Sequence, residues 1–166
     1  MVIAKKASLD PTAIDAFFHD YDQQLLQNMR IKMEREKSLQ RLKDSHLITN
    51  DVMAKISPID PDPARNFGLV WWPAMAVAWA DGHFDIWERE TILSILSHRG
   101  VSKRKVASII ESSPRPTGAS DSDWKRWEQF AAEELASCDS EIRSELTKSI
   151  RMYCQRVAEA SGGILG

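Results

Sequence analysis

Apolar residues recur at three- and four-residue steps along most of the chain, which is the pattern of amphipathic α-helices. From Pro11 to about Leu42 this pattern predicts one long helix, and a short helix is expected from Asn50 to Ile56. The apolar stripe of the long helix consists of Ile14, Phe17, Phe18, Tyr21, Leu25, Met29 and Met33. Its second half, residues 30–44, mixes basic and acidic side chains, as a solvated face does.

A proline-rich segment interrupts the helical pattern. Three prolines fall between Ser57 and Pro63, and proline removes backbone donors and disfavours helix before itself. We therefore expect an ordered linker here. The predicted organisation is an N-terminal helical arm with its linker over residues 1–65, followed by a compact helical domain over residues 66–166.

The second part of the chain reads as a series of helices. The small, apolar stretch from Leu69 to Ala80 predicts a buried helix with Pro73 in its first turn. The aromatic residues at its end, Trp79 and Phe84, are expected to be buried. Further helices are expected from Asp85 to Gly100, after Ser102, from Asp123 to Ala136 and from Ser140 to Ala160, with a long loop at residues 112–122. No stretch alternates with a period of two, so the expected fold class is all-α.

Composition narrows the function classes. The chain has 166 residues, the size of one domain, and 22 Lys and Arg against 24 Asp and Glu, a formal charge of -2. Such a balance gives no global field to hold a phosphate backbone, so nucleic acid is not the expected partner. No apolar run approaches the roughly 20 residues of a membrane span, and no signal peptide is evident, so we expect a cytoplasmic protein. Cys138 and Cys154 lie outside zinc or CxxC spacings and are expected to be reduced and structural.

The most specific local pattern runs from Ala76 to Glu90, with the sequence AVAWADGHFDIWERE. It resembles the signature of TerB-like domains, in which a small-residue helix enters an ADG turn and an acidic residue opens the next helix. Those domains occur in tellurite-resistance TerB proteins and in DjlA-type co-chaperones. The resemblance covers residues 66–166 and is specific mainly over residues 74–96. It implies a TerB-like helical bundle with an internal pseudo-two-fold duplication, and a role in stress response or co-chaperone activity.

A weaker second copy of the pattern lies at the end of the chain. Residues 157–165 align with residues 77–85, and Ser161 stands where the first copy has Asp81. TerB-like domains usually continue into another acidic helix start at this point. We therefore expect the domain to be truncated at Gly166; the alternative is that the second half-site has been lost.

The acidic turn admits two interpretations. Asp81, Asp85 and Glu88 place three carboxylates around one glycine turn, where oxygen ligands could bind Ca²⁺ or Mg²⁺, and acidic residues at these turns are proposed metal ligands in the family it resembles. Alternatively, Asp85 and Glu88 form a capping box and Asp81 is a turn residue. A complete EF-hand is excluded, because Val77 and Trp79 occupy positions where that loop needs oxygen ligands.

The leading functional hypothesis is a non-catalytic interaction module, assisted by a divalent metal ion, with an unidentified protein partner. No nucleophile elbow, phosphate loop or HExxH pair is present, so no catalytic residue is assigned. Trp87 and His83, beside the turn, are the candidate partner contacts. The alternative is a divalent-metal-dependent enzyme using the three carboxylates, and a third hypothesis makes the long N-terminal helix a dimerisation or membrane-surface arm.

Overall fold

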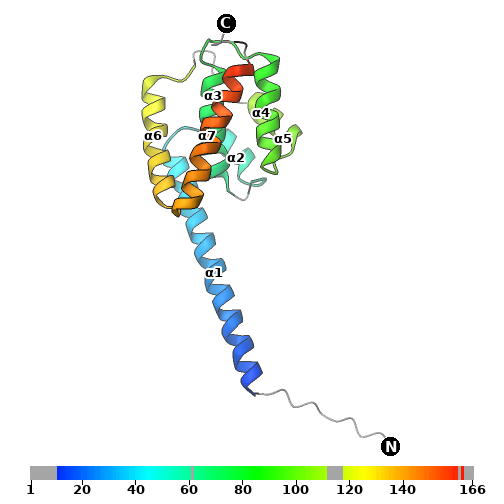
Figure 1. Ribbon diagram of the computed structural model, residues 1–166, viewed down its shortest axis with the longest axis vertical. Coiled ribbons are helices and arrows are strands. Elements are labelled where there is room, and N and C mark those ends of the chain that lie inside the picture. Colours follow the sequence, from blue (N-terminus) through cyan, green and yellow to red (C-terminus); the bar gives the residue numbers. More distant parts are fainter. Residues whose placement is uncertain (1–10, 61, 112–117, 161, 163–166) are drawn as a thin grey trace, which may run out of the picture. The chain divides into compact units, whose positions relative to one another are not determined.

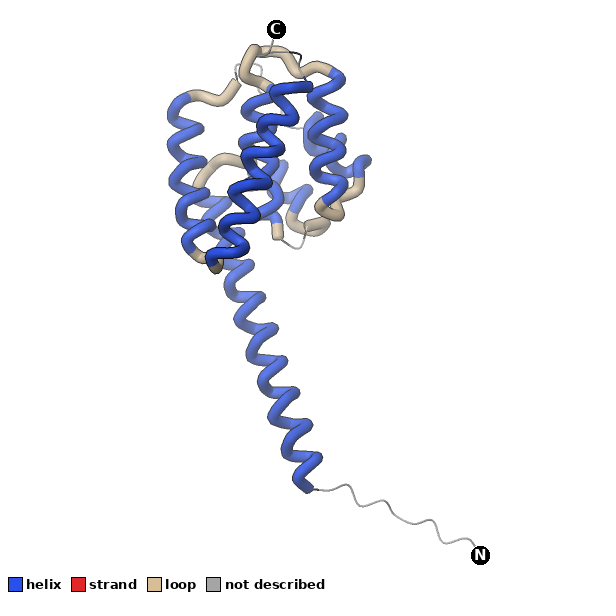
Figure 2. The backbone as a smooth tube through the Cα atoms, viewed as in Figure 1, coloured by secondary structure: helices blue, strands red, loops and turns tan. Residues whose placement is uncertain are grey.

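The computed structural model describes residues 11–60, 62–111, 118–160 and 162, without the side chains of residues 11, 13–15 and 17. Every regular element in these residues is helical (Figures 1 and 2), so the expected all-α fold is confirmed. The elements are α1 (Pro11–Asp44), α2 (Asn50–Ile56), the π-helix η1 (Ala64–Trp71), α3 (Trp72–Ala78), α4 (Ile86–His98), α5 (Lys103–Glu111), α6 (Asp121–Ala136) and α7 (Ser140–Ala160).

The chain divides into two compact units within α1, after Lys37. We call residues 11–37 the arm segment and residues 38–166 the body. This division differs from the predicted boundary after residue 65, and residues 38–65 supply core side chains of the body. These are Leu42, Leu47, Ile48, Val52, Met53, Ile56 and Ala64. The prolines of the linker interrupt helix, but they do not interrupt packing.

Helices η1 and α3 form the buried centre of the body. From Phe67 to Ala78 every residue except Val77 is buried. Helix α7 packs along α3 and α4, α6 packs against η1, and α5 packs against α4 (Figure 1). A segment surrounded in this way must be apolar on all sides, which is why its sequence shows no polar face.

The central segment differs from the single helix expected from Leu69 to Ala80. It begins earlier, as a π-helix, and changes to α3 at Trp72, where the backbone N–H of Trp72 donates to the carbonyl of Phe67. The next donor in that pattern would be residue 73, but Pro73 has no N–H. The indole Nε1 of Trp127, on α6, donates to the carbonyl of Gly68 instead, at 3.0 Å.

Gly68 allows other parts of the body to approach η1 closely. A Cβ added at this position would lie 2.6 Å from Cε1 of Phe130 and 2.8 Å from Cδ1 of Leu42. Both neighbours are buried, so neither ring nor branch can move without displacing other core atoms. Only glycine fits here without repacking.

A partly buried ion pair joins the last turns of α1 to α6. The Nε of Arg41 lies 2.6 Å from Oε1 of Glu134, and Arg41 also donates to the hydroxyl of Ser38. Glu134 is 0 % exposed, and its Oε2 has no hydrogen-bond partner. Removing the arginine would leave an uncompensated buried charge, which typically costs about 3 to 5 kcal/mol.

Most helix limits agree with the sequence prediction. Helices α2 and α7 have the expected bounds, and Gly100 has a φ of 87°, as expected for the residue that ends α4. Helix α6 starts two residues earlier than expected, because Ser120 is its N-cap and Asp123 completes the capping box from inside the first turn. Residues 112–117 of the predicted loop and Ser161 of the second copy lie outside the described residues, so the duplication stays a prediction.

Candidate functional site

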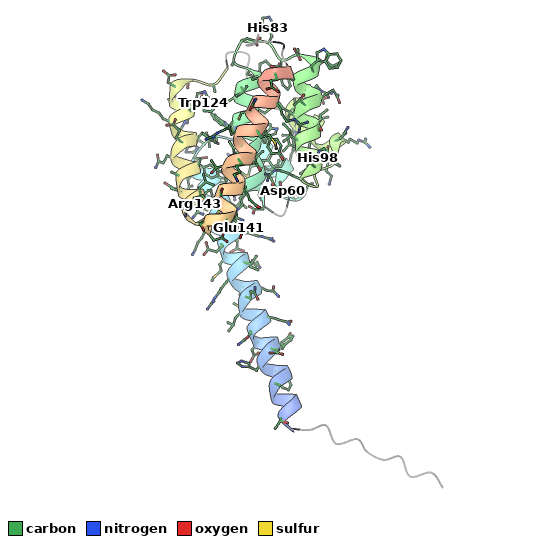
Figure 3. All side chains as sticks on the ribbon, viewed as in Figure 1. Asp60, His83, His98, Trp124, Glu141 and Arg143 are labelled. Carbon is green, nitrogen blue, oxygen red and sulfur yellow. The ribbon has the colours of Figure 1, made fainter. Side chains whose placement is uncertain are left out.

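The acidic turn connects α3 to α4 at one end of the body, where Figure 3 labels His83. Gly82 has a φ of 80°, and its N–H donates to the carbonyl of Trp79. The Oδ1 of Asp81 accepts a hydrogen bond from the backbone N–H of His83 at 2.9 Å. This is an Asx turn, in which an aspartate side chain replaces a backbone acceptor. Asp81 and His83 are both exposed.

Asp85 and Glu88 form the predicted capping box. The Oδ1 of Asp85 accepts from the backbone N–H groups of Trp87 at 2.7 Å and Glu88 at 2.9 Å. In return, the backbone N–H of Asp85 donates to Oε2 of Glu88 at 3.0 Å. Three backbone donors at the start of α4 therefore have side-chain acceptors, which fixes the first turn of the helix.

Glu88 is a buried carboxyl, 3 % exposed. Burial raises its pKa above the ordinary value of 4.5, and the hydrogen bond from Asp85 opposes this effect. The negative charges of Asp85 and Asp81 raise the pKa of Glu88 further. The carboxylates of Asp85 and Asp81 are therefore close enough to Glu88 to disfavour its charged form.

The carboxylates were also the predicted ligands of Ca²⁺ or Mg²⁺. Within the part of the chain that the structure describes, no group of three or more His, Cys, Asp or Glu side chains is arranged to hold a metal ion. Asp81, Asp85 and Glu88 each use an oxygen to accept a backbone hydrogen bond. This arrangement fits a capping box and a turn better than an ion site, and the divalent ion stays a prediction.

Aromatic residues surround the turn at different depths. Trp79 and Phe84 stack with their ring centroids 5.1 Å apart, but both are only partly buried. The expectation that they are buried is therefore met only in part, because they lie on either side of the turn at the edge of the core. Ile86 and Trp87 extend into solvent and are 66 % and 68 % exposed.

A network of polar side chains, which the sequence did not indicate, joins the proline-rich segment to the rest of the body. Oδ1 of the buried Asp60 accepts from the N–H of Asp62 and the amide of Asn66, both at 2.8 Å. The Oδ1 of Asn66 accepts from Nη1 of Arg99 at 2.9 Å, and Arg99 lies over the ring of Tyr153. An aspartate among prolines is a turn signal, but its burial depends on contacts that are distant in sequence.

A pocket of about 220 Å³ lies in another part of the body. Its arginines are both paired, Arg41 with Glu134 and Arg126 with Asp123. It is lined by Arg41, Asp44, Ser45, Arg126, Gln129, Phe130 and Glu133. None of the three carboxylates of the acidic turn lines this pocket, so it offers no substrate site for an enzyme that uses them.

No protein-family model, curated protein or solved structure matches the chain. The resemblance to TerB-like domains therefore stays a prediction that rests on residues 74–96. Among the described residues, no helix combines the length and the apolar character needed to cross a membrane.

The raised pKa of Glu88 predicts a pH dependence of stability. Because the folded state holds this proton more tightly than the unfolded chain, the free energy of unfolding falls as pH rises from about 4.5 through the folded-state pKa. Glu88→Gln keeps an acceptor for the N–H of Asp85 but cannot ionise. The melting temperature of Glu88→Gln minus that of the unmutated protein should therefore increase from pH 3.5 to pH 7. The exposed Glu90→Gln is the control and should show little change, and a relative melting temperature of Glu88→Gln that falls with pH would contradict the assignment.

Asp81→Asn separates the turn interpretation from the ion interpretation. Asparagine keeps a carbonyl acceptor for the N–H of His83, so a turn residue should lose at most about 1 kcal/mol. An ion bound with a Kd near 10 μM would stabilise the unmutated protein by about 2.7 kcal/mol at millimolar concentration, and most of this increment should vanish in the variant. The capping-box assignment predicts that chelator, Ca²⁺ and Mg²⁺ give the same melting temperature. An ion-dependent shift that Asp81→Asn abolishes would establish the metal site.

Proposed function

We propose that the body is a non-catalytic, TerB-like interaction module that binds a partner protein through Ile86 and Trp87. The observation that carries this proposal is their exposure in the first turn of α4. Exposing a large apolar side chain to water costs free energy, and burial against a partner would recover it. Tryptophan is also among the residues most enriched at binding hot spots. A surface of this kind suits an apolar anchor site.

The capping box supports the proposal by making the anchor rigid. The backbone N–H of Trp87 is one of the two donors bound by Asp85, and Glu88 is buried directly after it. A side chain on a fixed helical turn loses less conformational freedom on binding than one on a loose loop. In this proposal Asp85 and Glu88 position the contact residues and do not themselves contact the partner.

The surroundings of the anchor define the chemistry of the partner. Asp81 and Glu90 add negative charge near the apolar pair, and His83 adds an exposed polar side chain. The matching partner is a protein segment with an apolar side chain flanked by basic residues. A stress-response or co-chaperone setting in the cytoplasm follows from the resemblance to TerB-like domains.

A divalent-metal-dependent enzyme at Asp81, Asp85 and Glu88 is the alternative function. The observation that favours it is the repulsion of the Glu88 carboxylate by Asp85 and Asp81, which a bound cation would relieve. The ion titration of Asp81→Asn decides this alternative.

Site-specific photocrosslinking tests the interaction module. A photoreactive residue at position 87 should capture a distinct protein in cells, and one at the exposed Met152 of α7 should not capture it. With that protein purified, Trp87→Ala should raise the Kd by about tenfold or more, the effect of removing a binding hot spot of 1.4 kcal/mol or above.

Met152→Ala should leave the Kd unchanged. Both substitutions affect exposed side chains, so the melting temperature should stay within a few degrees of the unmutated value. Equal losses of affinity in the two variants, or the same captured proteins at both positions, would contradict Trp87 as the anchor.

A further inference from the structure

The arm segment carries a long apolar surface. From Phe18 to Lys37 every side chain is exposed. The large apolar members of this stretch are Phe18, Tyr21, Leu25, Leu26, Met29, Ile31 and Met33. Five of them follow one another at three- or four-residue steps and so share one side of the helix; we call this the arm stripe, which consists of Phe18, Tyr21, Leu25, Met29 and Met33.

We expect another apolar surface to pack against this stripe. Helices in proteins gain most of their stability from packing an amphipathic face, and isolated helices are marginal in water. A contiguous exposed apolar surface on a soluble chain marks an interaction site. The charged residues of the arm segment indicate which partner fits the stripe.

The two halves of the arm segment carry opposite charge. Residues 11–27 contain three acidic residues, Asp15, Asp20 and Asp22, and no Lys or Arg. Residues 28–37 contain four basic residues, Arg30, Lys32, Arg35 and Lys37, against Glu34 and Glu36. The segment is therefore complementary to a reversed copy of itself.

We propose that the arm segment binds the arm segment of a second copy of this chain in antiparallel orientation. With the two-fold axis at Leu25, Tyr21 lies level with Met29 of the second copy, and the stripes overlap over roughly 15 residues, about 22 Å. The acidic half of each helix then lies beside the basic half of the other. A parallel pair would place acidic beside acidic and basic beside basic, which is unfavourable.

The charge pattern also favours a second copy over a lipid surface. Helices that lie in a membrane interface carry Lys and Arg along their polar face, which attracts them to anionic lipids. The first half of the arm segment contains acidic residues and no Lys or Arg, so an anionic lipid surface would repel it. This self-association goes beyond the proposed function of the body and does not depend on it.

Sedimentation of the full chain from low to high micromolar concentration tests the proposal. We expect a concentration-dependent dimer. Leu25→Glu places a charge in the centre of the stripe and should raise the dimer Kd by about tenfold or more. The matched control is Gln27→Glu, the same added charge on the opposite side of the helix, which should dimerise nearly as well as the unmutated chain.

The orientation is tested by salt and by charge reversal. An antiparallel dimer should weaken when NaCl is raised, since screening removes the attraction between unlike halves. Asp20→Lys combined with Asp22→Lys should also weaken it, because the altered half then meets the basic half of the second copy. A parallel dimer would strengthen with salt and would respond little to this reversal, because like charges would still face each other.

Near-UV circular dichroism separates the arm from the body in these variants. All six tryptophans lie between Trp71 and Trp127, so their signal reports a folded body whatever the arm does. A chain that stays monomeric at about 100 μM, or an equal loss in Leu25→Glu and Gln27→Glu, would overturn the proposal. So would a monomer that binds anionic phosphatidylserine vesicles through Leu25. Trp87→Ala should dimerise normally, so failure of the partner site and failure of the dimer are distinguishable.

Discussion

The close approach at Gly68 is the contact on which the rest of the body depends. This glycine lies in a helix that is buried on every side, and the absence of a Cβ lets Phe130 and Leu42 occupy the space beside its backbone. The same approach brings the indole of Trp127 within 3.0 Å of the Gly68 carbonyl. One missing methyl group thus permits both the apolar contact and the hydrogen bond that join α6 to the centre of the body.

The candidate site is a consequence of that fixed centre. Because α3 is buried among its neighbours, its end at Ala78 fixes the position at which the acidic turn begins. The turn in turn fixes the position at which α4 begins. The carboxyl groups of Asp85 and Glu88 then satisfy the backbone donors of α4. Their chemistry is used for structure, whereas the side chain of Trp87 between them is exposed to solvent. We therefore propose a site whose acidic residues position an aromatic anchor.

Local signals explain the parts of this structure that the sequence predicted. The spacing of apolar residues predicted the limits of α2 and α7, and the Asp85-x-x-Glu88 pattern predicted the capping box with its hydrogen bonds. Both depend on residues within one or two helical turns of each other. The partner contacts and the ion at the turn depend on molecules outside the chain, so these predictions await measurement.

The parts that the sequence did not predict depend on distant contacts. Three prolines indicated a linker, but Asp60 within that segment is tied through Asn66 to Arg99, so the segment packs with the body. The π-helix depends on α6 for the donor that Pro73 lacks. The partial exposure of Trp79 follows from where the turn meets the core edge. None of these features leaves a periodic pattern along the chain.

The most direct test of this account is the stability of Gly68→Ala in two backgrounds. In an open helix this substitution stabilises by about 0.5 to 1 kcal/mol, but overpacking a core typically costs about 1 to 3 kcal/mol. We expect the denaturant midpoint to fall in the otherwise unmutated protein. The loss should be smaller in the Phe130→Leu background, where the ring that meets the new methyl group is absent. A gain in stability, or the same loss in both backgrounds, would contradict a body built on the close approach at Gly68.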